Sequence, residues 1–148
     1  METSENKIIP AIFGLNGYNL TKKEINIIKN NKIYGYILFS RNILNLTQLK
    51  NLISHINFLS TTKPIIMIDH EGGRVNRFSK LFSQKKYTGS YFGSLYIKNR
   101  KKFVYEANLF IDFNTKLFKY LGINTVAYPV SDLSYKRTTK VIGDRSFS

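Results

Sequence analysis

The stretch PIIMIDHEGGRVNRF, residues 64–78, decides the fold class. Its apolar residues between Pro64 and Asp69 stand in an unbroken row instead of alternating with polar ones. Such a row predicts a parallel strand, Ile65–Asp69, that is covered on both faces. The acid, the glycine pair and the arginines that follow predict a loop at the carboxyl end of this strand, where ligands bind in parallel α/β folds.

The plan of a buried strand followed by a helix recurs on both sides of this stretch. We predict further strands at Ile8–Phe13, Ile33–Phe39 and Ile123–Tyr128. Strands that alternate with helices call for a parallel sheet with right-handed crossovers. Four such strands fit either half of a barrel or a small doubly wound sheet, and the pattern alone leaves both open.

Capping residues place the first two helices. Thr21 and Glu24 have the spacing of a capping box, and the helix that they start should end near Asn30–Asn31, because Asn tolerates the left-handed conformation. After a loop at Ser40–Leu46, Thr47 is expected to cap the second helix.

Glycines and polar residues mark the later loops. A long loop is predicted from Glu71 to Tyr96, followed by a helix over Ile97–Leu121 that Gly122 ends. The polar tail, Ser131–Ser148, is predicted to be another loop.

Length and composition exclude several classes of protein. The 148 residues suffice for one domain but fall short of a complete eight-fold barrel, which needs about 250. The absence of cysteine excludes disulfides and thiolate chemistry, and no apolar run approaches a membrane span, so we expect a cytoplasmic protein with no membrane contact. Although the net charge is +14, the lysines are dispersed, and we expect no nucleic-acid partner.

The segment 68–78 carries the chemistry that the sequence predicts. Asp69 can accept hydrogen bonds from hydroxyl groups, and the arginines of this segment, Arg74 and Arg77, can present forked donors to oxygen atoms. Together with the glycine turn, they suit a polyhydroxylated or anionic small molecule. From spacing alone, Asp69 could equally cap the following turn, and Arg77, like Arg145 in the tail, could be a surface ion-pair residue.

The remaining polar residues near the strand ends give weaker signals. His70 and Glu71 lack the converging ligands that a metal needs, and His55 falls within a predicted helix, so we expect a structural role for the first two and neither a metal site nor a cofactor. Arg41 and Asn42 end the second strand, where they could line a pocket or organise its rim.

Five motifs together resemble bacterial glycoside hydrolase family 3 enzymes, in particular the β-N-acetylglucosaminidases of cell-wall recycling. They occur in the order of that family and at similar spacing, from about residue 8 to the end of the chain. The motifs are FGL at 13–15, GYILFSRN at 35–42, IDHEGGRVNRF at 68–78, PVSDL at 129–133 and IGDRSF at 142–147.

This resemblance implies a fold and a substrate. It implies that residues 1–148 are the N-terminal part of a barrel domain, about the first four βα units of an incomplete (β/α)8 barrel. The implied activity is retaining hydrolysis of terminal N-acetylglucosamine from peptidoglycan fragments. Asp69, Arg77 and Arg145 match family residues that bind the sugar.

The resemblance assigns no catalytic residue to this chain. In the resembling enzymes the nucleophile lies on a late barrel strand and the acid/base histidine on a loop beyond the fourth strand, and neither position occurs here. We therefore expect a chain that is inactive alone, either the remnant of a hydrolase or one half of a split enzyme that a second chain completes. A non-catalytic domain that binds a sugar or an anionic polymer is the alternative.

Overall fold

A computed structural model describes residues 7–135 and 141–147. Within these ranges the chain forms two compact units. The first, here called the sheet unit, contains the chain up to Ile68 and returns for Phe118–Val126. The second, the loop–helix unit, contains Asp69–Leu117 and the chain from Ala127 onward.

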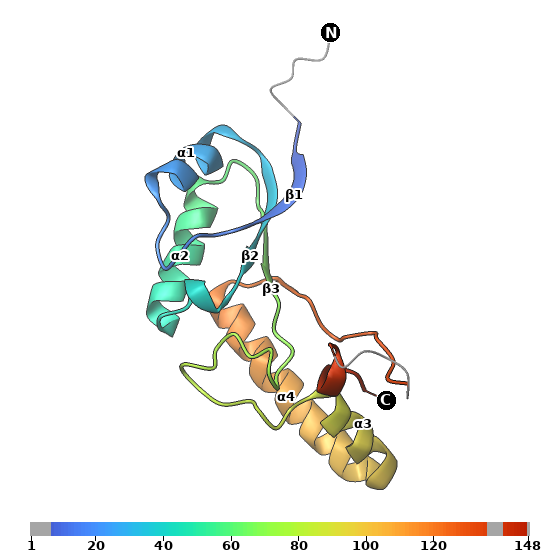
Figure 1. Ribbon diagram of the computed structural model, residues 1–148. Helices are drawn as coiled ribbons and strands as arrows, with labels where there is room; N and C mark the ends of the chain where they lie inside the picture. Colours follow the sequence, from blue (N-terminus) through green and yellow to red (C-terminus); the bar gives the residue numbers. More distant parts are fainter. Residues whose placement is uncertain (1–6, 136–140, 148) are drawn as a thin grey trace. The chain divides into compact units, whose positions relative to one another are not determined.

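The sheet unit is a parallel four-stranded sheet whose strands pair in sequence order, β1-β2-β3-β4. Its helices α1 and α2 contact each other and lie on one side of the sheet (Figure 1). The elements are β1 (Ile9–Gly14), α1 (Lys22–Asn30), β2 (Ile33–Leu38), the short 3-10 helix η2 (Ser40–Asn42), α2 (Leu46–Leu59), β3 (Ile65–Ile68) and β4 (Thr125–Val126). The predicted α/β class with a parallel sheet is confirmed, although β4 is shorter than the predicted strand Ile123–Tyr128.

The two faces of the sheet differ in burial. On the helix side, Tyr36 and Leu38 of β2 pair in register with Ile66 and Ile68 of β3, and all four are at most 2% exposed. The Tyr36 side chain forms a hydrogen bond with Ser60, the C-cap residue of α2. This contact shows that Tyr36 lies on the face of the sheet that α2 covers. On the other face Ile12, Ile37 and Met67 remain partly exposed, so the expected cover on both faces of β3 is wrong for this unit.

The predicted start of α1 is confirmed, and the reason given for its end is wrong. The Thr21 hydroxyl accepts from the Glu24 backbone N–H, and the Glu24 carboxylate accepts from the Thr21 backbone N–H. At the other end Asn31 is extended, with φ −138°, and its side-chain amide donates to the Ile27 carbonyl. Asn31 thus ends the helix by satisfying a free carbonyl with its side chain, without entering the left-handed region.

The cap of α2 lies two residues before the predicted one. The Asn45 side chain accepts from the Gln48 backbone N–H at 2.8 Å, and Asn45 has the extended backbone of an N-cap. Thr47, predicted to be the cap, lies inside the first turn and is exposed. Asn and Thr are both favoured at the N-cap position, so residue type alone did not decide which of the two caps α2.

The loop–helix unit contains α3 (Gly89–Lys98), most of α4 (Arg100–Leu121) and the 3-10 helix η3 (Gly143–Arg145). The predicted loop 71–96 is therefore wrong from Gly89 onward, because a helix capped by Thr88 begins there. Gly122, with φ +87°, ends α4 as predicted.

Long-range packing explains the glycines that suggested a loop. The tail approaches α3 so closely that a Cβ atom on Gly89 would lie 2.0 Å from the Arg145 carbonyl oxygen, and one on Gly93 would lie 1.6 Å from that of Phe147. Figure 1 shows η3 beside α3. Gly89 and Gly93, one helical turn apart, thus lack side chains where the backbone of the tail packs against α3. Of the predicted tail loop, residues 136–140 and 148 lie outside the described ranges.

No helix within the described ranges is long and apolar enough to cross a membrane. The assignment of all 148 residues to one barrel domain stays a prediction.

The cap assignment predicts the effects of two substitutions. Asn45→Ala should lower the free energy of unfolding of the chain by about 1 kcal/mol, because the Gln48 N–H loses its acceptor. Thr47→Ala, the matched control, should change it by less than about 0.5 kcal/mol. Urea unfolding of both variants measures this, and an equal loss for the two would contradict the assignment.

Candidate functional site

The loop after β3 begins with a turn that only glycine can form. Gly72 and Gly73 have φ values of +79° and +54°, in the left-handed region that side chains disfavour. A Cβ atom on Gly72 would also lie 2.4 Å from the Tyr87 carbonyl oxygen. Around this turn the Glu71 N–H donates to the Val75 carbonyl, and the Gly73 N–H donates to the Gln84 carbonyl. The predicted tight turn is confirmed, and it presents the flanking acids and arginines from a fixed backbone.

Asp69 and Arg77 form one ion pair within this loop. An Arg77 Nη2–H donates to Asp69 Oδ2, and the Arg77 Nε–H donates to the Asp69 carbonyl oxygen at 2.7 Å. Both side chains keep 24% of their surface exposed. The carboxylate is thus fixed without being sealed from a ligand.

A buried chain of hydrogen bonds supports this pair from below. The Arg77 backbone N–H donates to His70 Nδ1 at 3.2 Å, so the neutral ring carries its proton on Nε2 and donates it to Gln84 Oε1 at 2.6 Å. The Gln84 amide donates in turn to Asn114 on α4. His70 is 2% exposed, and burial lowers its pKa below the usual value of 6.5. The structural role predicted for His70 fits this geometry.

Glu71 and Arg145 form the most buried ion pair of the site. The Arg145 Nε–H donates to Glu71 Oε2 at 2.7 Å, and an Nη2–H donates to Oε1 at 2.6 Å. The Glu71 side chain is only 6% exposed. Hydrogen bonding to Glu71 raises the pKa of Arg145. Burial, together with the Glu71 charge, raises the pKa of the nearby Tyr128 to about 12. The partner of Glu71 was missed at the sequence level because it lies 74 residues away.

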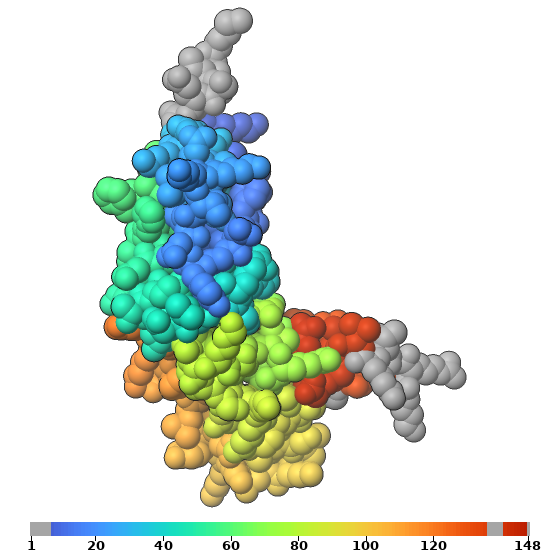
Figure 2. Space-filling model, turned by 60° about the vertical axis from the view of Figure 1, so that its left-hand side comes forward, coloured from blue at the N-terminus to red at the C-terminus, as the bar shows by residue number. Residues whose placement is uncertain are grey.

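Further contacts fix the tail against the loop. Arg74 Nε lies 3.1 Å from an Asp144 carboxylate oxygen, and its Nη2 group donates to the carbonyls of Val141 and Ile142. Figure 2 shows residues 141–147, in red, against the yellow-green loop. Because the Arg74 and Asp144 side chains are each 48% exposed, this ion pair contributes at most about 1 kcal/mol.

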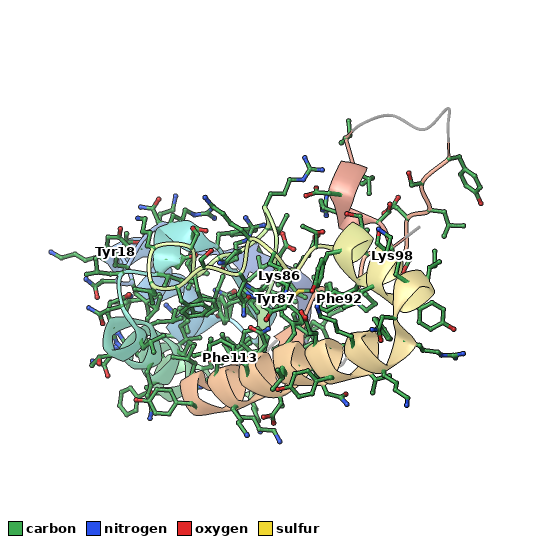
Figure 3. The ribbon with its side chains drawn as sticks, turned by 90° about the horizontal axis from the view of Figure 1, so that it is seen from below. Tyr18, Lys86, Tyr87, Phe92, Lys98 and Phe113 are labelled. Atoms are coloured by element: carbon green, nitrogen blue, oxygen red, sulfur yellow. The ribbon has the colours of Figure 1, made fainter. Side chains whose placement is uncertain are left out.

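The site rests on an aromatic cluster between the loop, α3 and α4. Tyr87 stacks on Phe92 with ring centroids 5.8 Å apart, and both residues are labelled in Figure 3. The centroids of Tyr87 and Phe110 lie 5.3 Å apart. Glu106, buried on α4, accepts from the Tyr91 hydroxyl and pairs with Lys86 at 2.6 Å. Beside the cluster lies a pocket of about 400 Å³ that no predicted site residue lines; its walls are Phe82, Ser83, Gln84, Tyr87, Leu109, Phe110 and Phe113.

The three predicted site residues gather in the loop–helix unit. Asp69 pairs with Arg77, and the charges of Asp69 and Asp132 both act on the Arg145 guanidinium. Arg41 and Asn42 instead organise the sheet unit, where the fully buried Asn42 amide donates to the Leu15 and Gly17 carbonyls. Within residues 7–135 and 141–147 no three His, Cys, Asp or Glu side chains gather to hold a metal ion.

The Asp69–Arg77 and Glu71–Arg145 pairs together carry no net charge. Two carboxylates and two guanidiniums neutralise each other in pairs, while Asp69 keeps an exposed acceptor edge and the arginines supply donors. Acceptors and donors side by side match hydroxyl groups, each of which can donate and accept.

Curated relatives resemble almost the whole chain. The β-hexosaminidase of Thioalkalivibrio sulfidiphilus is 33% identical over 138 residues, 93% of this chain and 39% of its own length. That of Haemophilus ducreyi is 35% identical over 136 residues, 92% of this chain and 38% of its own. The chain thus spans about two-fifths of these relatives, in their N-terminal region. No family model matches the sequence.

Solved structures give the same result. NagZ from Neisseria gonorrhoeae, in complex with N-trifluoroacetyl-D-glucosamine, superposes with a TM-score of 0.84 and 33% identity over 93% of this chain and 40% of its own. A glycoside hydrolase family 3 β-N-acetylglucosaminidase from Paenibacillus gives a TM-score of 0.73 and 25% identity, over 92% of this chain and 25% of its own. The predicted resemblance to this class of glycosidase, limited to its N-terminal part, is confirmed.

The buried state of His70 predicts a pH dependence of stability. Because its folded pKa is lowered, the unfolded chain takes up a proton first, and stability is lost as the pH falls below about 6.5. The slope from this residue approaches about 1.4 kcal/mol per pH unit. His70→Asn, whose side chain does not titrate, should remove this part of the slope between pH 7.5 and about 5.5.

His55→Asn provides the control, since His55 is exposed on α2 and is the only other histidine. Urea unfolding at several pH values should give this variant the slope of the unmodified chain. A slope that His70→Asn leaves unchanged would refute the neutral, buried state of His70.

Proposed function

We propose that Asp69, Arg77 and Arg145 bind the N-acetylglucosamine unit of a peptidoglycan fragment, as the sugar-binding part of a retaining β-N-acetylhexosaminidase. The observation that carries this proposal is the pair of ion pairs in one unit: the partly exposed Asp69 carboxylate binds Arg77, and Glu71 binds Arg145, on which the Asp69 charge also acts. The names of the relatives support it, and so does the sugar derivative bound to the gonococcal enzyme.

The charge balance favours a neutral sugar over an anionic polymer. Each arginine of the cluster already pairs with an acid, so the positive charge available to a phosphate or carboxylate ligand is small. Hydroxyl and amide groups need only directed donors and acceptors, and the partly exposed Asp69 and Arg145 side chains can supply one of each.

We also propose that the chain forms about the first four βα units of a (β/α)8 barrel. The strands pair in sequence order and in parallel, as in a barrel, and α1 and α2 lie on one side of the sheet (Figure 1). The opposite face, with Ile12, Ile37 and Met67 partly exposed, would then be the interior of the barrel.

In this proposal the nucleophile and the acid/base group lie on segments outside these 148 residues. A second chain that supplies the other half of the barrel would complete the site in the cytoplasm. The partly exposed sheet face and the unpaired edge of β1 are the surfaces that such a half would cover.

Sugar binding can be tested with Arg77→Lys, which keeps the charge beside Asp69 and removes the forked donor. N-acetylglucosamine affinity, measured by NMR titration of the 148-residue chain, should weaken by about 10-fold, as expected for a lost charged hydrogen bond. Arg100→Lys, at the exposed start of α4, is the matched control and should leave the affinity within about 2-fold. A chain that does not bind the sugar would contradict the proposal.

Hydrolysis tests the missing half. The purified chain alone should release no chromophore from a chromogenic N-acetyl-β-glucosaminide, because it lacks the nucleophile. Adding a separately produced polypeptide that covers the unmatched part of the Neisseria gonorrhoeae enzyme should restore turnover if the halves assemble. Turnover by the chain alone would overturn the assignment of the catalytic groups to other segments.

A further inference from the structure

We propose that Glu71 is a positioning residue, whose buried carboxylate fixes the guanidinium of Arg145 as a donor to the bound sugar. The inference rests on the proposed sugar-binding function and goes beyond it, because it assigns a role to a residue outside the predicted site. Its basis is the geometry of one ion pair and the independence of that pair from the other contacts of the tail.

Both oxygens of the Glu71 carboxylate bind Arg145. Each of its oxygens accepts one hydrogen bond, from Nε at 2.7 Å and from Nη2 at 2.6 Å. A fork of two parallel bonds defines the plane of the guanidinium as well as its distance. Since the Glu71 side chain is 6% exposed, its charge would be costly to leave unpaired, so the pair should persist.

Arg145 keeps donors for a ligand when this pair is formed. A guanidinium has five N–H groups, and Glu71 takes one on Nε and one on Nη2. For the other three, the described part of the chain shows no acceptor, and the Arg145 side chain is 30% exposed. The Asp69 charge contributes to the raised pKa of Arg145, so the two side chains lie within electrostatic reach of each other.

Other contacts hold the tail backbone without Glu71. Arg74 binds Asp144 and the carbonyls of Val141 and Ile142, and the tail packs on α3 at Gly89 and Gly93. Loss of the Glu71 carboxylate should therefore release the Arg145 side chain while its Cα stays in place. This separates positioning of the guanidinium from folding of the tail.

The test measures the Arg145 side chain and the sugar affinity together. The NMR signal of the Arg145 Nε–H, assigned by its disappearance in Arg145→Lys, should be protected from exchange in the unmodified chain. Glu71→Gln should abolish this protection and weaken N-acetylglucosamine binding about 10-fold. Glu106→Gln is the matched control, because Glu106 is a buried acid of the same unit that binds Lys86 and Tyr91 instead.

A double-mutant cycle decides whether Glu71 acts through Arg145. Glu71→Gln combined with Arg145→Lys should bind the sugar no more weakly than Arg145→Lys alone, whereas additive losses would overturn the proposal. Should Glu71→Gln not fold, Glu71→Asp keeps the charge and withdraws the carboxylate by one methylene, and it should also expose the Nε–H to exchange.

The two proposals can fail separately. The positioning role would be overturned if the Arg145 Nε–H stayed protected from exchange in both Glu71→Gln and Glu71→Asp, irrespective of the measured affinity for the sugar. If the unmodified chain does not bind N-acetylglucosamine, the proposed function fails. The exchange signal alone then decides whether Glu71 fixes Arg145, and its loss in Glu71→Gln but not in Glu106→Gln supports that role.

Discussion

A buried carboxylate needs a partner, and Glu71 finds one in the guanidinium of Arg145, 74 residues later in the chain. Much of the loop–helix unit is consistent with this constraint. The tail has to reach the loop after β3, and it does so by passing against a face of α3 that Gly89 and Gly93 leave bare. Arg74 then holds the carbonyls that lead into η3. The two distant motifs that carry Asp69, Arg77 and Arg145 are thus joined by the ion pairs Glu71–Arg145 and Arg74–Asp144, of which the first is the more buried.

Sequence patterns predicted features whose causes are local. The capping box of α1 needs only Thr21 and Glu24, three residues apart, and Gly122 ends α4 with its own φ of +87°. The features that escaped prediction have distant causes. Helix α3 was missed because Gly89 and Gly93 suggest a loop when the tail that packs on them is unknown. The partner of Glu71 likewise escaped prediction, because Arg145 lies 74 residues away in the sequence.

The candidate site shows the same division. Residue type alone predicts that Asp69 is a hydrogen-bond acceptor and that Arg77 and Arg145 are donors. Only the structure shows that these three residues belong to one compact unit. The hydrogen-bond chain from His70 through Gln84 to Asn114 was beyond prediction, since it joins a loop to a helix 30 residues further on. Position in the fold also reassigned Asn42, which is fully buried and supports the backbone of the sheet unit.

Most of the carboxylates in the described part of the chain are held by other groups of the chain. A retaining glycosidase needs a carboxylate that is free to attack the sugar. In the described ranges Asp69, Glu71, Glu106, Asp112 and Asp144 each form an ion pair, and Glu24 caps α1. A buried carboxylate such as that of Glu71 would lose its pairing with a guanidinium on attack, whereas the exposed pairs of Asp112 and Asp144 are weak. Asp132 is the exception among the described acids, and it lies where its charge acts on Arg145, as an acceptor beside the proposed sugar would. The proposed function therefore gives these residues the recognition of hydroxyl groups and assigns bond cleavage to groups on other segments.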